Sequence, residues 1–303
     1  MSLAETRAYA EGLDAQIAEV DWAAPDPAAA PFRFEAPSGS LAGWSLGDPA
    51  NPRVVLVPGA TGSKEDFVLL APPLAEAGYF VQTFDLAGQY ESADAGPSLA
   101  TGRYDFDMHV ADVLAFLAAG DAAHVLGYSY GGIVAQQIVA TRPDLVRSLT
   151  LLTTPPAVGN TFRRVKVVGF LAPFLTAHQA GGLMRWGITT NKNKVDRARF
   201  DFVVNRLRVT RRQSVDDMMV TMLDAPDLRA AVADSGIPAL VATGEHDLWR
   251  VALHAEYADQ IGAELAVYRT GHSPCERTPN QLAFDMLRLF ERAAAAESAQ
   301  RDK

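Results

Sequence analysis

The segment 127–132 has the sequence GYSYGG and offers a serine with the surroundings that nucleophilic catalysis needs. It follows an apolar run at 123–126 that is typical of a buried strand and precedes a helix-forming run at 133–140. In a tight strand-to-helix turn, Gly127 and Gly131 leave room for the backbone and the hydroxyl of Ser129 projects above the sheet. The positive end of the following helix lies near that hydroxyl. The pattern therefore predicts Ser129 as a nucleophile.

A serine hydroxyl is a weak nucleophile at neutral pH, so it needs a base that takes its proton and an acid that orients the base. The sequences GEHD at 244–247 and GH at 271–272 each follow a strand-like run. They offer Asp247 as the acid and His272 as the base, in the chain order Ser, Asp, His expected for such a turn. The segment 152–156 contains no acid that could replace Asp247. Glu245 stays open as an alternative acid, and we favour Asp247.

Two backbone N–H groups are needed to stabilise the oxyanion that forms when a serine attacks a carbonyl. The residue after the nucleophile, Tyr130, is expected to supply one of them. The loop after the apolar run 53–57 is expected to supply the other. Ala60 is the candidate there, with Thr61 behind it.

Other chemistry-bearing residues receive simpler interpretations. Cys275 is interpreted as a packed thiol, because Ser129 already occupies the nucleophile position. The sequence GATGSK at 59–64 resembles a phosphate-binding loop, but only two residues separate its glycines and Glu65 follows the lysine. We also find no cluster of His, Cys and carboxylate residues with metal-ligand spacing, so we expect no cofactor and no metal. The remaining histidines are interpreted as surface or capping residues: His109, His124, His178, His246 and His254.

Strand-like and helix-like runs alternate from residue 53 onward, which predicts an α/β fold with a parallel sheet and helices on both faces. The segment 157–236 interrupts this alternation, lacks clear strand runs and looks helical. We therefore expect a core formed by 1–156 and 237–303 and a helical cap formed by 157–236. The expected strands are 31–37 and 41–46, paired as a hairpin, then 53–57, 79–84, 123–128, 146–152, 239–243 and 263–268. The main expected helices are 65–76, 104–119, 130–140, 253–260 and 279–296.

Composition and charge narrow the function classes. The chain has 303 residues and a net charge of −9, which argues against a nucleic-acid partner. The single cysteine allows no intrachain disulfide. Residues 1–20 have no long apolar core, and no run of about 18 apolar residues occurs anywhere. We therefore expect a cytoplasmic protein without a membrane span.

The charge is unevenly distributed along the chain. Segment 157–236 has 13 Lys and Arg against 7 Asp and Glu, whereas the rest has 14 against 29. A basic insert in an acidic body is interpreted either as a solvated helical surface or as a lid that attracts an anionic, carboxylate-bearing substrate.

These motifs together resemble the α/β-hydrolase fold family, in its lidded serine-hydrolase branch. The resemblance covers residues 31–156 and 237–296 and includes Asp85-Leu86-Ala87-Gly88 with Ser92, similar to the turn after the family's fourth strand. It implies an eight-stranded, mostly parallel sheet, a helical cap after the sixth strand and cofactor-free hydrolysis through an acyl-enzyme. Pro58-Gly59 stands where members often have His-Gly, which weakens assignment to a subfamily. Ser129 in the strand-to-helix turn argues against the dehalogenase and epoxide hydrolase branches of the family, which have aspartate at that position.

The leading functional hypothesis is a carboxylic-ester hydrolase that acts on a small-molecule acyl substrate. The alternatives are hydrolysis of a carbon–carbon bond, an amide or a thioester by the same residues, and a non-enzymatic receptor or regulator. The candidate walls of the substrate pocket are Thr61, Tyr128, Phe170, Phe174, Trp186, Leu248 and Trp249.

Overall fold

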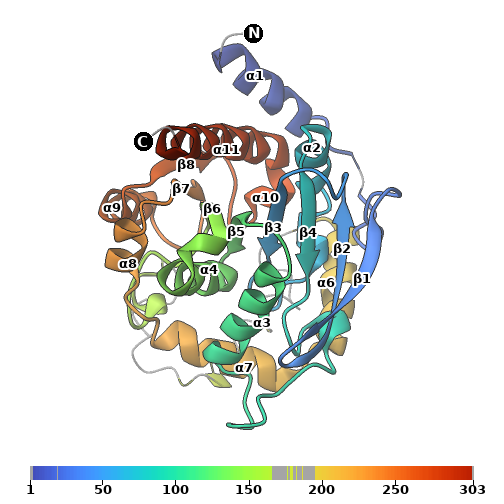
Figure 1. Cartoon of the computed structure of the whole chain (residues 1–303). Coiled ribbons are helices and arrows are strands. Elements are labelled where there is room, and N and C mark those ends of the chain that lie inside the picture. The colour runs from blue at the N-terminus through green and yellow to red at the C-terminus, as the bar shows by residue number, and fades with distance from the viewer. Residues whose placement is uncertain are drawn as a thin grey trace.

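The protein is built on one eight-stranded sheet with the order β1-β2-β4-β3-β5-β6-β7-β8 (Figure 1). The computed structural model describes residues 3–18, 20–165 and 195–301, together with positions 176, 178, 179, 182 and 186. Strand β2 runs antiparallel to both of its neighbours, and every pairing from β4 onward is parallel. The predicted mostly parallel sheet is therefore confirmed. The strands are β1 (Ala30–Ala36), β2 (Gly39–Leu46), β3 (Arg53–Val57), β4 (Phe80–Phe84), β5 (Ala123–Tyr128), β6 (Val146–Leu152), β7 (Ala239–Gly244) and β8 (Glu264–Tyr268).

Helices cover both faces of the sheet because the central strands are apolar on both sides. In β3, Val55 and Val57 pack into one hydrophobic cluster, and Val54 and Leu56 pack into the other. The first cluster includes residues of α3, α4 and α9, and the second includes residues of α2 and α11. The α-helices of the core are α1 (Leu3–Asp14), α2 (Ala71–Glu76), α3 (Phe106–Ala118), α4 (Tyr130–Thr141), α9 (Val251–Ile261), α10 (Pro274–Arg277) and α11 (Pro279–Arg301).

Two of the predicted helices differ from the observed ones. The expected helix at 65–76 is divided into the 3-10 helix η1 (Lys64–Phe67) and α2, whose first turn contains Pro72 and Pro73. Proline has no backbone N–H to donate, so it is tolerated at the start of a helix and not in its interior. At the other end of the chain, α11 continues to Arg301, beyond the expected end at residue 296.

The described elements between β6 and β7 are helical. They are the 3-10 helix η4 (Thr161–Arg164), α6 (Arg197–Val209), α7 (Arg212–Leu223) and α8 (Arg229–Asp234). Helix α8 packs against α4 and α9 of the core, although the predicted cap extends to residue 236. The division into core and cap stays a prediction. Among the described residues, no helix is long and apolar enough to cross a membrane.

Candidate active site

Ser129 lies in the turn between β5 and α4, where the backbone is strained. Its φ of 52° and ψ of −114° form a conformation that few residues other than glycine adopt. Close packing explains the flanking glycines. A Cβ atom on Gly127 would lie 2.5 Å from the carbonyl oxygen of Gly131, and one on Gly131 would lie 2.5 Å from the carbonyl oxygen of Val57. The turn therefore needs small residues on both sides of Ser129.

The structure brings Ser129, His272 and Asp247 together at the carboxyl edge of the sheet. Nε2 of His272 lies 3.2 Å from Oγ of Ser129, and Nδ1 lies 2.5 Å from Oδ1 of Asp247. Glu245, the alternative acid, is exposed. The hydroxyl of Thr153 donates to the carbonyl oxygen of His272 at 3.0 Å and thereby holds the histidine loop against the end of β6. This arrangement can move a proton from Ser129 to an imidazole that a carboxylate orients.

The carboxylate of Asp247 is fully buried, and its environment favours the charged form. Burial by itself raises the pKa of this group. The interaction with His272 and the hydrogen bonds from His254 and His272 outweigh burial, so the pKa lies below its ordinary value. The backbone N–H of Leu248 also donates to Oδ1 at 2.7 Å. Asp247 is therefore held ionised beside His272.

The loop that contains Ala60 lies against Ser129 through Gly59, and Tyr130 follows Ser129 in the chain. Gly59 packs so closely that a Cβ there would lie 3.1 Å from Cβ of Ser129. Among the described residues, neither the backbone N–H of Ala60 nor that of Tyr130 has an intramolecular acceptor. The backbone N–H of Thr61 donates to Oε1 of Gln89 at 3.1 Å. Thr61 is therefore occupied as a donor, which leaves Ala60 as the candidate in this loop.

The predicted pocket residues lie in different environments. The hydroxyl of Tyr128 is 2.9 Å from Oγ of Ser273, and its ring lies 5.6 Å from that of His272. Trp249 is fully buried: its Nε1 donates to the carbonyl oxygen of Thr161 at 2.8 Å, and its ring lies 6.1 Å from that of His272. Leu248 and Trp186 are exposed.

Of the other three predicted pocket residues, the structure describes only Thr61. Thr61 is buried within the candidate oxyanion loop. Phe170 and Phe174 lie outside the described residues. A cavity of about 450 Å³ lies elsewhere, between the β1–β2 hairpin and η1, and Ser129 is not among its lining residues. The substrate pocket therefore stays a prediction.

Residues 52–175 match a family model described as the alpha/beta hydrolase fold. An esterase from Exiguobacterium antarcticum has a similar structure, with a TM-score of 0.70 at 17% identity over 86% of this chain and 98% of that chain. The likeness to this solved structure concerns the fold. The chain has the α/β-hydrolase fold.

Two relatives of this chain carry esterase names. Rhodomycin D methylesterase DauP from Streptomyces sp. (strain C5) is 34% identical over 124 residues, which are 36% of this chain and 38% of that relative. Pimeloyl-[acyl-carrier protein] methyl ester esterase from Aliivibrio salmonicida (strain LFI1238) is 40% identical over 78 residues, 26% of this chain and 27% of that relative. The chain thus aligns with less than two fifths of either protein.

The interpretation of three of the histidines as surface or capping residues is wrong. His254 is fully buried, and its Nε2 lies 2.9 Å from Oδ2 of Asp247. His109 contacts the hydroxyl of Tyr130, and His124 contacts Oγ of Ser148. Burial lowers the pKa of His109 to about 4 and that of His124 to about 3. By contrast, His178 and His246 are exposed.

A sequence signal for His254 existed. The buried residues of α9 are His254, Tyr257, Ala258 and Ile261, which follow the spacing of one helical face. Helical periodicity therefore places His254 on the buried face. Only the fold shows that this face reaches Asp247.

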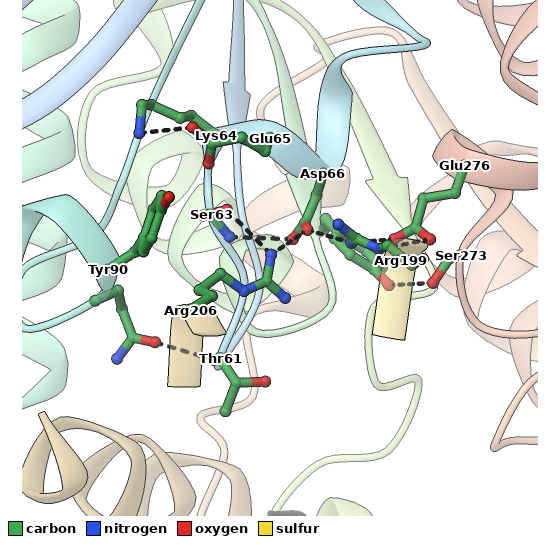
Figure 2. A network of polar contacts seen from close by, with 12 residues as sticks. Thr61, Ser63, Lys64, Glu65, Asp66, Tyr90, Arg199, Arg206, Ser273 and Glu276 are labelled. Atoms are coloured by element: carbon green, nitrogen blue, oxygen red, sulfur yellow. Dashed lines mark hydrogen bonds and ion pairs between the residues drawn. The ribbon is translucent and has the colours of Figure 1, made fainter. Parts of the chain in front are cut away.

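A buried ion network joins α6 to η1 and α10, the two short helices that follow the candidate oxyanion loop and the His272 loop. Nη2 of Arg199 lies 2.6 Å from both Oδ1 of Asp66 and Oε1 of Glu276, and Nη1 of Arg206 lies 2.5 Å from the same Asp66 oxygen. Arg206 also donates to Oγ of Ser63 at 3.0 Å. Figure 2 shows Asp66 between the two guanidinium groups. The network links the loop after β3 to the start of α10, directly after the His272 loop.

The network contains two carboxylates and two guanidinium groups, so acidic and basic groups are equal in number. Burial by itself raises the pKa of Asp66, but the charges of Arg206 and Arg199 and their hydrogen bonds hold it below its ordinary value. The two buried arginines of α6 therefore neutralise core carboxylates. Burial raises the pKa of Glu276, and the charge of Arg199 opposes this shift.

Proposed function

We propose that the protein is a cofactor-independent serine hydrolase that cleaves a carboxylic ester of a small molecule through an acyl-enzyme on Ser129. The observation that carries this proposal is the chain of contacts from Oγ of Ser129 to His272 and on to Asp247, at 3.2 and 2.5 Å. The names of two relatives, a methylesterase and a methyl ester esterase, support an ester as the substrate.

The reaction begins when Oγ of Ser129 attacks the ester carbonyl and its proton moves to Nε2 of His272. Asp247 accepts the Nδ1–H of His272, which fixes the tautomer and stabilises the imidazolium. The negative charge on the former carbonyl oxygen is stabilised by the backbone N–H groups of Ala60 and Tyr130. Loss of one such donor typically slows catalysis by about 10²–10³-fold.

The tetrahedral intermediate collapses when His272 gives its proton to the leaving alcohol. The acyl group then remains on Ser129 as an ester. A water molecule that His272 deprotonates attacks this ester, and the second collapse returns the proton to Ser129 and releases the acid. No step needs a metal or an organic cofactor.

The charge of the substrate is a separate question. The two buried arginines of α6 are paired with Asp66 and Glu276, and Arg211, directly before α7, is paired with Asp94. These pairs favour the interpretation that the basic charge of segment 157–236 serves contacts with the acidic core. The pairing supports a neutral ester, and the predicted anionic substrate stays an alternative.

A substrate comparison tests the proposed function. We expect turnover of p-nitrophenyl esters, with a preference among acyl chain lengths from acetate upward. A β-diketone should not be cleaved faster than these esters. Asp247→Asn should lower kcat by about 10⁴-fold if Asp247 orients His272. The control Glu245→Gln changes an exposed carboxylate two residues away and should retain wild-type turnover. Faster cleavage of the β-diketone, or equal losses in both variants, would contradict the proposal.

A further inference from the structure

Asp247 is held by two imidazoles, one on each carboxylate oxygen. Oδ1 lies 2.5 Å from Nδ1 of His272, and Oδ2 lies 2.9 Å from Nε2 of His254. His254 belongs to α9, and its side chain is fully buried. The hydroxyl of Thr243 also lies near Oδ2, at the longer distance of 3.4 Å. His254 is therefore the closer of these two partners of Oδ2.

The hydrogen bonds fix what His254 can do. A carboxylate only accepts, so Nε2 of His254 must carry the proton of this contact. Nδ1 is buried and has no hydrogen-bond partner among the described residues. A proton on Nδ1 would therefore lack an acceptor in a buried place, which is costly. The geometry makes His254 a hydrogen-bond donor to Asp247, with no access to the substrate.

Trp249 packs against both imidazoles. Its ring lies 6.5 Å from that of His254 and 6.1 Å from that of His272. The indole is itself anchored, because its Nε1 donates to the carbonyl oxygen of Thr161 at 2.8 Å. The two histidines and the carboxylate between them therefore form one packed unit.

We propose that His254 is a positioning residue that holds the Asp247 carboxylate in the orientation that His272 requires and shares its negative charge. This inference rests on the proposed function of Ser129, His272 and Asp247. A charge-assisted hydrogen bond to a buried carboxylate stabilises the ion and restricts its rotation. Because Asp247 shares its negative charge with His254, it stabilises the protonated form of His272 less than a carboxylate without this second partner would.

Among the described residues, no charged group other than Asp247 pairs with the ring nitrogen atoms of His254. Helix α9 packs against α8, β7 and β8. On α8, Arg229 pairs with Asp227, and on β8, Glu264 pairs with Arg292. On α9 itself, Glu256 and Asp259 are exposed. The pH dependence expected below is therefore assigned to the contact of His254 with Asp247.

Three substitutions separate the hydrogen bond from simple packing. His254→Leu removes the donor and keeps an apolar side chain. His254→Asn keeps polarity, but its amide nitrogen corresponds to Nδ1 and does not reach Asp247. His254→Gln places its amide nitrogen near the position of Nε2 and restores a donor. The measurement is the pH profile of kcat/KM on p-nitrophenyl acetate, with thermal denaturation as the folding control.

We expect His254→Leu and His254→Asn to lower kcat/KM by about tenfold to a hundredfold, the range that a lost charge-assisted hydrogen bond implies. We also expect their acid limb to move to higher pH by about one unit, because a carboxylate with one fewer donor holds the His272 proton more strongly. His254→Gln should recover most of the rate and the wild-type profile.

The outcomes distinguish this inference from the proposed function. Unchanged profiles in folded His254→Leu and His254→Asn, with Ser129→Ala inactive, would overturn the role of His254 alone. Full activity of Ser129→Ala would overturn the proposed function itself. If His254→Leu fails to fold, the comparison of His254→Asn with His254→Gln decides, and equal profiles of those two would overturn the inference.

Discussion

Strained single residues are concentrated around Ser129. The non-glycine residues with positive φ in the described chain are Thr61, Tyr90, Ser129 and Thr153. Thr61 lies in the candidate oxyanion loop, Ser129 is the candidate nucleophile, and Thr153 binds the carbonyl oxygen of His272. Each such conformation costs on the order of 1–3 kcal/mol and persists only where surrounding contacts enforce it. The strain lies where the proposed chemistry needs fixed geometry.

A buried carboxyl on α3 predicts how stability depends on pH. Asp112 accepts hydrogen bonds from the backbone N–H and the hydroxyl of Ser38, at 3.0 and 2.6 Å. Burial raises the pKa of Asp112 to about 6, and the Ser38 hydrogen bonds oppose this shift. The folded state thus binds this proton more tightly than the unfolded state. The contribution of Asp112 to the free energy of unfolding should therefore rise as pH falls from 7.5 to 4.5, by about 2 kcal/mol.

Asp112→Asn should remove this part of the pH dependence. The check is the free energy of unfolding from urea denaturation at pH 7.5 and pH 4.5. Asp107→Asn, on the exposed face of the same helix, serves as the control and should keep the wild-type slope. Identical slopes for Asp112→Asn and the wild type would rule out the assignment to Asp112.

Helix α6 is attached to the core by charged side chains, and two of its arginines differ sharply in environment. The side chain of Arg199 is 5% exposed and pairs with Asp66 and Glu276, whereas that of Arg197 is 87% exposed and pairs with Asp201. Arg199 and its two partners are buried, and no water there can solvate a carboxylate that has lost its arginine. The pair of Arg197 with Asp201 lies in water, where such pairs contribute little.

Arg199→Met should lower the free energy of unfolding by about 3–5 kcal/mol, because it leaves buried carboxylates without a partner. Arg197→Met, two residues away on the same helix, should change it by less than about 1 kcal/mol. Adding Glu276→Gln to Arg199→Met should recover part of the loss. Chemical denaturation measures all three, and equal losses for the two arginine variants would refute the buried network as a stabilising contact.

Elements with a local signal could be predicted, and contacts between distant residues could not. Buried parallel strands such as Arg53–Val57 are continuous apolar runs, so their order along the chain was visible. The same order brought Ser129, Asp247 and His272 to one edge, because parallel strands end together. The contact of Arg199 with Asp66 and Glu276 joins residues 133 and 77 positions apart. No local pattern records such a pairing.

Ion pairs in the fold explain why the chain has a basic segment at 157–236 and an excess of acidic residues elsewhere. Among the described residues of segment 157–236, both basic and acidic side chains pair with oppositely charged residues outside the segment. Arg199, Arg206 and Arg211 reach core carboxylates, and Arg103 of the core reaches Asp217 of α7 at 2.8 Å. The sequence indicated the imbalance, and only the fold shows that complementary charges meet.

The central claim is that Ser129 is the nucleophile, and covalent labelling tests it most directly. The protein should be treated with a fluorophosphonate, measured by intact mass spectrometry and digested to locate the adduct. We predict one adduct per chain on the peptide that contains Ser129, its loss in Ser129→Ala and its retention in Ser273→Ala, whose hydroxyl contacts Tyr128 beside His272. No adduct on the folded wild type, or an adduct that persists in Ser129→Ala, would contradict the account.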